Sequence, residues 1–209
     1  RLEHARHDRL IPLRVREEER LVAREVERAQ HREHRDLEGA EGTPVLRRLT
    51  RGMYVSIGST CNICEERTPD RAAVMRYESD GSSGRVYSSG LRNAVGMALH
   101  PTTGKIWVTQ NERDNLEPSH EDLPFEEINI LQDGGHFGWP YCHGDRIPNP
   151  EFRDRRRCEG TIPPAFALPA HSAPLGITFL DRATAFPAEY RGDALVAYHG
   201  SWNRDVPTG

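Results

Sequence analysis

The sequence of 209 residues contains no apolar run that approaches the ~20 residues of a bilayer-spanning helix, so no membrane span is predicted. The net charge of -4 is small and gives no reason to expect nucleic acid or an anionic membrane as a partner. The first residues alternate charged and apolar side chains, unlike the basic stretch and apolar run of a signal peptide. A Gly-rich dinucleotide fingerprint, a Walker phosphate loop and a His-Glu-x-x-His motif are also missing. Nucleotide-binding enzymes and zinc peptidases of those kinds are therefore not indicated.

Aromatic residues are missing from the first part of the chain, where Tyr54 is the first to occur. Arg, Glu and His crowd residues 1–52, and Pro12 interrupts a weak helical stripe of apolar residues: Leu10, Leu13, Leu21, Val22 and Val26. So few apolar side chains do not offset the entropy lost on ordering. We predict that residues 1–52 are a charged, helical or disordered segment without catalytic chemistry, and that residues 53–209 form the folded domain. A helix that binds a partner is the alternative.

Only four cysteines are present, at positions 61, 64, 142 and 158. A zinc ribbon would need a second closely spaced pair, whereas Cys142 and Cys158 span a loop. Two disulfides that close loops, formed in an oxidising compartment, fit this spacing better. We predict that Cys142 pairs with Cys158 and Cys61 with Cys64.

From Tyr54 onward, short apolar runs alternate with Gly, Pro, Asn and Asp, a pattern typical of strands joined by turns. Seven strands are predicted: Tyr54–Ile57, Ala72–Tyr77, Val95–Leu99, Ile106–Thr109, Glu127–Leu131, Leu175–Leu180 and Ala194–Tyr198. Their spacing favours an all-β propeller of about three to four blades over a sandwich. The loops Asn111–Phe125 and Tyr141–Ala170 are too long for simple turns, so function is expected in them.

Seven motifs follow one another in this part of the chain, and together they carry a resemblance. They are Tyr-Val-Ser-Ile-Gly-Ser (54–59), Gly-Leu-Arg-Asn-Ala-Val-Gly-Met-Ala (90–98), Trp-Val-Thr-Gln-Asn-Glu-Arg-Asp-Asn (107–115), Glu-Glu-Ile-Asn (126–129), Gly-Gly-His-Phe-Gly-Trp-Pro-Tyr-Cys (134–142), His-Ser-Ala-Pro-Leu-Gly (171–176) and the stretch 190–204. In order and spacing they resemble the soluble quinoprotein glucose/sorbosone dehydrogenase family, and its sorbosone-dehydrogenase-like branch in particular.

The resemblance implies a six-bladed β-propeller, visible here in part, that binds pyrroloquinoline quinone (PQQ) and calcium at its loop end. It implies oxidation of an aldose or related sugar by hydride transfer to the quinone, and an electron acceptor as a further partner. A periplasmic or secreted location is implied as well. In such a site a base, a hard cation and an Arg have ordinary roles in proton transfer and charge stabilisation.

Five residues match positions with a role in the family. Arg92 and Asn93 match the motif whose Arg reaches the quinone, and a charged guanidinium suits a pair of quinone oxygens. Glu112 and Arg113 lie where two main-chain oxygens hold the cofactor's calcium, which needs oxygen ligands rather than particular side chains. His171 lies where relatives contact the quinone. The bland alternatives are a solvated Arg92, a simple polar turn at 111–115 and a structural His171.

Weaker matches extend this set. Glu127 and Phe137 correspond to main-chain ligands of a second, structural calcium in some members, and His199 and Arg204 lie within reach of the cofactor carboxylates. The family's base His is absent, because the corresponding position is Ala40 and the nearest histidine is His34. We therefore expect a fragment of a longer gene. A catalytically silent propeller that binds sugars, and an inactive fragment, are the alternatives.

Overall fold

The computed structural model describes residues 10–13, 45–49 and 52–209, with the exception of residues 119, 153 and 182. Within these residues the regular secondary structure is almost entirely β, and the helical elements are two short 3-10 turns, η2 (Arg155–Cys158) and η3 (Ala188–Tyr190). The long strands are β2 (Val45–Leu49), β3 (Gly52–Ile57), β4 (Ala73–Glu78), β5 (Arg85–Ser89), β6 (Ala94–Leu99), β7 (Ile106–Gln110), β8 (Glu126–Ile130), β13 (Pro174–Phe179) and β14 (Ala194–Tyr198). Shorter strands are β1 (Leu10–Leu13), β9 (Gly135–His136), β10 (Cys142–His143), β11 (Ile147–Pro148) and β12 (Phe166–Leu168).

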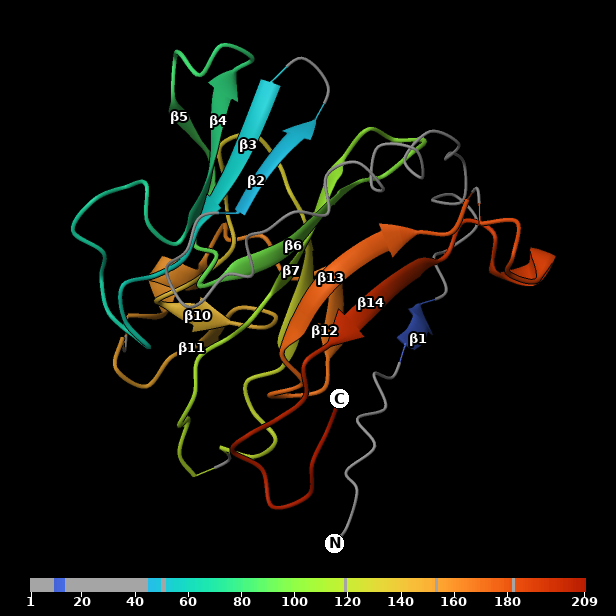
Figure 1. The fold of residues 1–209 in the computed structure, drawn as a ribbon. Coiled ribbons are helices and arrows are strands. Elements are labelled where there is room, and N and C mark those ends of the chain that lie inside the picture. Colours follow the sequence, from blue (N-terminus) through green and yellow to red (C-terminus); the bar gives the residue numbers. More distant parts are fainter. Residues whose placement is uncertain (1–9, 14–44, 50–51, 119, 153, 182) are drawn as a thin grey trace, which may run out of the picture.

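Three sheets stand side by side like the blades of a propeller (Figure 1). Their strand orders are β2-β3-β4-β5-β9, β12-β8-β7-β6 and β1-β14-β13, and β10 and β11 form a separate hairpin. All pairs are antiparallel except β5 and β9. The predicted all-β fold and the blade-like arrangement are therefore confirmed, and the chain forms part of a propeller.

Alternation of side chains explains most strands. In β3 and β14 every second residue is buried, as expected for strands that lie with one face on a core. The central strand β7 is instead buried throughout, because sheets cover it on both sides. One apolar core lies around Tyr54, Val74 and Val108, and a second lies around Trp107, Ile177 and Val196. β7 contributes to both cores, since its successive side chains point to opposite faces.

Two polar contacts join neighbouring sheets. The hydroxyl of Ser56 on β3 donates to the main-chain oxygen of Ala94 on β6 at 2.5 Å. Thr109 on β7 accepts from the Gly96 N–H and donates to the Leu175 oxygen, both at 2.8 Å. At this second junction a Cβ on Gly96 would lie 2.0 Å from the Leu175 oxygen. Glycine is therefore required where β6 approaches β13.

All seven predicted strands are confirmed, as β3, β4, β6, β7, β8, β13 and β14. The prediction for residues 1–52 is wrong at two places, because Leu10–Leu13 and Val45–Leu49 are strands rather than helix or disorder. β1 pairs with β14 and β2 pairs with β3, so ladder hydrogen bonds hold them despite their poor local pattern. The rest of the predicted helical stripe, together with His34 and Ala40, lies outside the described residues.

Both predicted disulfides are confirmed. Cys61 and Cys64 have Cα atoms 6.2 Å apart, and Cys142 and Cys158 have Cα atoms 5.8 Å apart. The first closes a four-residue ring after β3, and the second closes the loop that contains the β10–β11 hairpin. None of the described helices is long and apolar enough to span a membrane.

Candidate functional site

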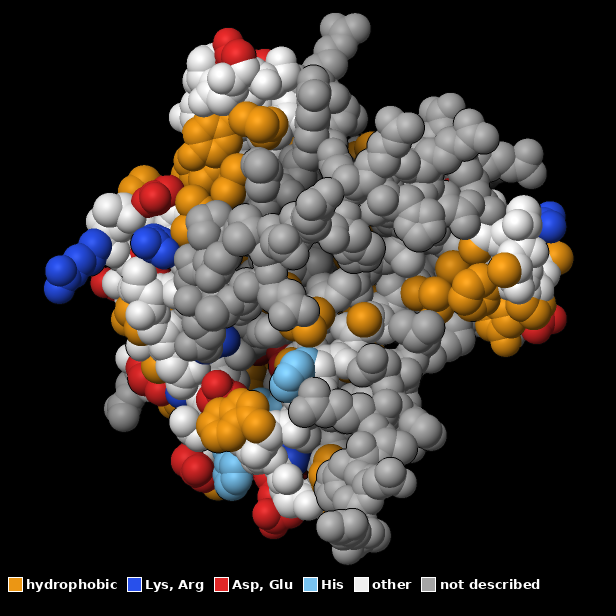
Figure 2. All heavy atoms as spheres, in the orientation of Figure 1, with side chains coloured by type: hydrophobic (Ala, Val, Ile, Leu, Met, Phe, Trp, Pro, Cys, Tyr) orange, Lys and Arg blue, Asp and Glu red, His pale blue; other side chains and the backbone are white. Residues whose placement is uncertain are grey.

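Loops from different sheets meet at one end of the molecule. Figure 1 shows the loop after β7 and the segment after β14 extending from the same lower end of the sheets. In the space-filling view, acidic, basic and histidine side chains lie close together on the lower part of that face (Figure 2). Glu112 and Arg113 belong to the loop after β7, Arg92 and Asn93 to the turn between β5 and β6, and His171 to the turn between β12 and β13.

Arg92 is the centre of the arrangement and is only 3% exposed. Its Nη1 donates to the main-chain oxygens of Glu112 at 2.8 Å and Asn111 at 3.4 Å. On the other side, Nε donates to the Asn62 main-chain oxygen and Nη2 to Asn62 Oδ1, both at 3.2 Å. A buried guanidinium is thus held between two loops, and the alternative of a solvated surface Arg92 is wrong.

The main chain around Arg92 ties the same loops together. The Asn93 oxygen accepts from the Asn111 N–H at 2.9 Å, and the Arg92 oxygen accepts from the Ser59 N–H at 2.7 Å. The structure therefore places Arg92, Asn93 and Glu112 side by side, as the resemblance implied. Their roles toward a cofactor stay predictions.

His171 forms a second cluster with Asp114. Its Nδ1 lies 3.5 Å from Asp114 Oδ1, and its Nε2 contacts the His120 main-chain oxygen. Asn203 Nδ2 donates to Asp114 Oδ1 at 3.1 Å. The hydrogen bond to Asp114 raises the pKa of His171, and the bond to His171 lowers the pKa of the Asp114 carboxyl.

These contacts favour a doubly protonated His171, because both ring nitrogens face oxygen acceptors. An imidazolium held in this way is a fixed cation rather than a free base. The residue also has a positive φ of 60°, a conformation that costs a residue with a side chain energy and that clusters at functional sites.

Asn62 connects the Arg92 and His171 clusters. Its Oδ1 accepts from the Asp114 N–H at 2.8 Å, and its Nδ2 donates to the Asp114 oxygen at 3.0 Å. The predicted residues from three parts of the chain are thereby brought into one continuous hydrogen-bonded network.

Three buried glutamates lie behind this network. The Glu126 carboxylate accepts from the N–H of Glu112 at 2.6 Å and from that of Ala173 at 3.3 Å. Burial nevertheless raises the pKa of Glu126 to about 8. Burial likewise raises the pKa of Glu112 and of Glu127, and the negative charge of Glu112 adds to the effect on Glu127. In this group of glutamates, protonated carboxyls are therefore favoured over three negative charges.

The remaining predicted residues are less closely connected. The Arg113 side chain donates to Glu151 at 2.6 Å and to Asn149 at 3.3 Å, so its predicted role rests on its main chain alone. Arg204 donates to the Ala170 main-chain oxygen at 3.5 Å and also contacts the Glu121 oxygen. His199 contacts the neighbouring Gly200 oxygen at 3.3 Å. The second calcium at Glu127 and Phe137 stays a prediction.

Two side-chain oxygens near the site are buried without a hydrogen-bond partner among the described residues. They are Asn111 Oδ1, beside Glu112, and Asn203 Oδ1, beside Asp114. A buried polar atom without a partner costs free energy. Oxygen atoms of this kind are suitable ligands for a hard cation such as calcium.

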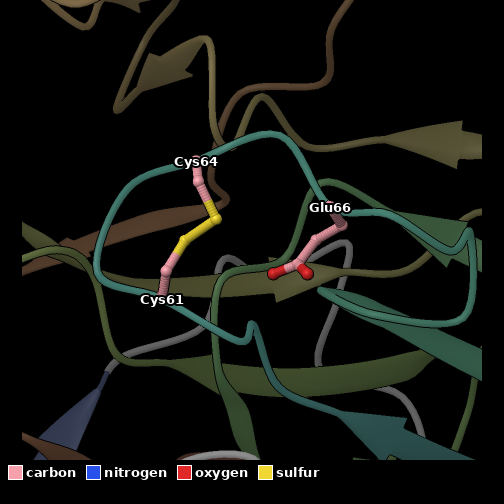
Figure 3. Close-up of side chains that lie close together, drawn as sticks. All are labelled: Cys61, Cys64 and Glu66. Atoms are coloured by element: carbon pink, nitrogen blue, oxygen red, sulfur yellow. A yellow bond between two sulfur atoms is a disulfide. The ribbon is translucent and has the colours of Figure 1, made fainter.

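A pocket of about 520 Å³ lies beside this network, in the loop between β3 and β4. Its lining does not include Arg92, Asn93 or His171, and consists of Thr60, Cys64, Glu65, Glu66, Arg67, Thr68 and Arg71. Cys61, Cys64 and Glu66 lie within 4.8 Å of one another there (Figure 3). The two sulfurs are bonded to each other and both Glu66 oxygens accept from Thr60 at 2.7 Å, so this cluster is not a metal centre in its oxidised form.

Several residues of the network were not singled out from the sequence. They are Asn62, Glu126 and Asn203. Two signals were present in the sequence. Asn62 lies between two cysteines, and Glu126 and Glu127 are adjacent acids at the start of a predicted strand. Because adjacent strand residues point to opposite faces, covering either face of the sheet buries at least one of these acids.

The family model described as TrAA12-like matches residues 52–209. A protein of Borreliella burgdorferi described as uncharacterized is 35% identical over 161 residues, which are 75% of this chain and 41% of that protein. The pyrroloquinoline quinone-dependent sugar dehydrogenase of Hypocrea jecorina is 27% identical over 153 residues, which are 58% of this chain and 34% of the enzyme.

Solved structures are similar as well. The calcium structure of the Trichoderma reesei family AA12 carbohydrate-active enzyme superposes with a TM-score of 0.69 at 25% identity, covering 80% of this chain and 51% of that one. The chain thus spans less than half the length of the curated relatives it matches and about half of that solved structure.

Proposed function

Because this chain belongs to the TrAA12-like family, we propose that it forms the Arg92 half of the active site of a PQQ-dependent sugar dehydrogenase. The observation that supports this most directly is the buried Arg92 guanidinium, which lies against the main-chain oxygens of Asn111 and Glu112. A relative that shares this part of the chain is a PQQ-dependent sugar dehydrogenase. The sorbosone-dehydrogenase-like branch remains part of the proposal only.

The chemistry of the residues fits both components of the cofactor. PQQ is an ortho-quinone that carries carboxylates, and when bound it accepts a hydride from the sugar. Arg92 is a fixed positive charge with a fork of donors, and the hydrogen bond to Asp114 raises the pKa of His171, which favours its protonated form. Asn93 joins the Arg92 turn to the loop that carries Asn111. These residues would bind and orient the quinone.

Calcium is proposed at the main-chain oxygens of Glu112 and Arg113. The partnerless Asn111 Oδ1 is an additional oxygen next to them. The structure of the Trichoderma reesei enzyme with calcium supports use of this cation in the family. Here the cation would supply positive charge beside Arg92 that helps to hold the quinone.

The sugar, the electron acceptor and the location follow from the same proposal. An aldose or related sugar is the expected substrate, and a separate acceptor takes the electrons from the reduced quinone. Two disulfides support a periplasmic or secreted location, because such bonds persist in oxidising compartments.

The test is a titration of the chain with PQQ in calcium buffer, followed by absorbance, with the Arg92→Ala variant as control. We expect saturable binding that EDTA reverses and that the variant weakens at least about tenfold. Absence of saturable binding at millimolar PQQ would overturn the proposal. In a dye-reduction assay with aldoses we expect weak turnover, because the family's base has no histidine counterpart and such groups contribute ~10²–10⁴-fold. Sugar binding without PQQ binding would favour a silent binding module.

A further inference from the structure

The short ring closed by Cys61 and Cys64 contains the residue that connects both clusters of the site. Figure 3 shows this disulfide and its ring, which projects from the loop between β3 and β4. Within the ring, Asn62 offers three polar groups to the site: its main-chain oxygen, Oδ1 and Nδ2. We propose that Asn62, held in this disulfide ring, is the positioning residue that fixes the Arg92 guanidinium and the Asp114 loop relative to each other. The inference rests on the proposed function for its catalytic meaning.

The first argument is the number of constraints that Asn62 places on Arg92. On one side of the guanidinium, Nη1 donates to the main-chain oxygens of Asn111 and Glu112. Asn62 binds the opposite side of the fork through two separate acceptors at 3.2 Å. With both sides held, the plane of the guanidinium is set, which a planar quinone partner requires.

The second argument is the pairing between Asn62 and Asp114. The amide accepts from the Asp114 N–H and donates to the Asp114 oxygen, so it binds that residue as another strand would. Asp114 in turn is the partner of His171. A shift of Asn62 would therefore move the partners of both Arg92 and His171.

The third argument is how the ring itself is held. Ser59, just before it, donates its N–H to the Arg92 oxygen and its hydroxyl to the Cys61 oxygen at 2.8 Å. Glu65, just after it, accepts from Tyr141 at 3.1 Å and from Arg157 at 2.5 Å. These two partners adjoin the other disulfide, Cys142–Cys158. The ring is thus fixed at both ends, and the disulfide removes the remaining freedom of the residues between them.

The test compares four variants of the full chain. Asn62→Ala removes the side-chain contacts and leaves the ring. Cys61→Ser with Cys64→Ser opens the ring and leaves Asn62. Ile63→Ala is the matched control, since Ile63 lies in the same ring and its side chain has no polar group. Asn62→Asp is a conservative variant that keeps an oxygen acceptor for Arg92 and for the Asp114 N–H.

Hydrogen exchange of the Asp114 amide is the readout that needs no cofactor. We expect Asn62→Ala and the double Ser variant to speed this exchange about tenfold, which corresponds to the loss of one hydrogen bond of roughly 1.4 kcal/mol. The Asn62→Asp and Ile63→Ala variants should remain within about threefold of wild type. The nitrogen NMR signal of the Arg92 Nε–H should broaden or shift in the same two variants. If either variant fails to fold, the other still decides the outcome.

PQQ binding in calcium then links the ring to the site. The first two variants should raise the dissociation constant about tenfold, and the control should not. If wild type does not bind PQQ, the proposed function fails while the Asp114 exchange still decides the positioning role. If wild type binds and Asn62→Ala leaves both exchange and binding unchanged, the positioning role is overturned and the proposed function stands.

Discussion

Arg92 Nη1 lies 2.8 Å from the main-chain oxygen of Glu112, the same oxygen that is proposed to bind calcium. A guanidinium and a divalent cation at one oxygen repel each other, and only nearby negative charge offsets this repulsion. Burial raises the pKa of the Glu112 carboxyl, and the positive charge of Arg92 opposes this rise in part. In the cofactor-free chain Arg92 donates hydrogen bonds to the main-chain oxygens of Asn111 and Glu112. A calcium ion that binds at Glu112 would share that oxygen with Arg92.

The first prediction is that Arg92→Ala destabilises the cofactor-free chain. The change leaves the buried oxygens of Asn62, Asn111 and Glu112 without this donor, and we expect a loss of about 1–3 kcal/mol in the free energy of unfolding. Urea denaturation followed by tryptophan fluorescence measures this. Arg85→Ala is the control, because its bidentate pair with Asp133 is exposed and contributes little. Equal stability of the Arg92 variant and wild type would contradict the prediction.

The second prediction concerns the junction between β6 and β13. Gly96→Ala should cost about 3 kcal/mol or more, because the new Cβ would meet main-chain atoms that cannot move without separating the sheets. Gly176→Ala on β13 is the matched control, since its Cβ would lie 3.9 Å from the Ala197 Cβ, an ordinary contact. Thermal unfolding of both variants decides the question. A Gly96 variant as stable as the Gly176 variant would show that the sheets approach less closely.

The third prediction concerns the order in which the disulfides are reduced. Cys61 and Cys64 are partly exposed, and Cys64 lines the pocket, whereas Cys142 is 1% and Cys158 4% exposed. Because exchange requires a thiolate to reach the sulfur, a dithiol reductant should open Cys61–Cys64 first. Timed alkylation and mass spectrometry of the four cysteines measure the order. Simultaneous reduction of both would contradict it.

The sequence predicted the long strands well because their apolar residues alternate or cluster between turn residues. It missed β5, whose Arg85, Ser88 and Ser89 are polar, since pairing with β4 rather than local pattern makes it a strand. The site was harder to predict. Arg92 and Glu112 are 20 residues apart, and only the match to a known family placed them together. Asn62 was missed because its partners lie 30 and 52 residues away and no local pattern points to them.

The fourth prediction concerns the pair of His171 and Asp114. The His171 pKa is raised above its ordinary 6.5, so its contribution to stability is present below that pH and is lost as pH rises through the folded pKa. The Asp114 pKa is lowered below 3.8, so its contribution is present above that pH and is lost on acidification. Both contributions to stability are therefore fully present only between pH 3.8 and pH 6.5. Asp114→Asn should therefore lower the His171 pKa in an NMR titration, while His143, whose pKa burial lowers to about 4, stays unchanged. An unchanged His171 pKa would contradict the assigned cause.

The last prediction concerns Glu126, whose pKa burial raises from 4.5 to about 8. Between these values the folded chain holds a proton that the unfolded chain has released. The contribution of Glu126 is therefore complete below pH 4.5 and is lost as pH rises through 8, with a slope of at most about 1.4 kcal/mol per pH unit. Glu126→Gln removes this proton uptake, so its free energy of unfolding should depend less on pH across the interval than that of wild type.

Glu151→Gln is the matched control for Glu126. The pKa of Glu151 is lowered by its bond to Arg113, so that carboxyl is charged in both states over most of the interval and adds slope only near its lower limit. Urea denaturation at several pH values between the two limits gives the three curves. Other raised groups, such as Glu127 and His171, contribute to the wild-type slope, and for this reason the difference between wild type and the Glu126 variant is the quantity that decides. If the two curves run parallel, Glu126 is already ionised in the folded chain, and the N–H donors of Glu112 and Ala173 outweigh its burial.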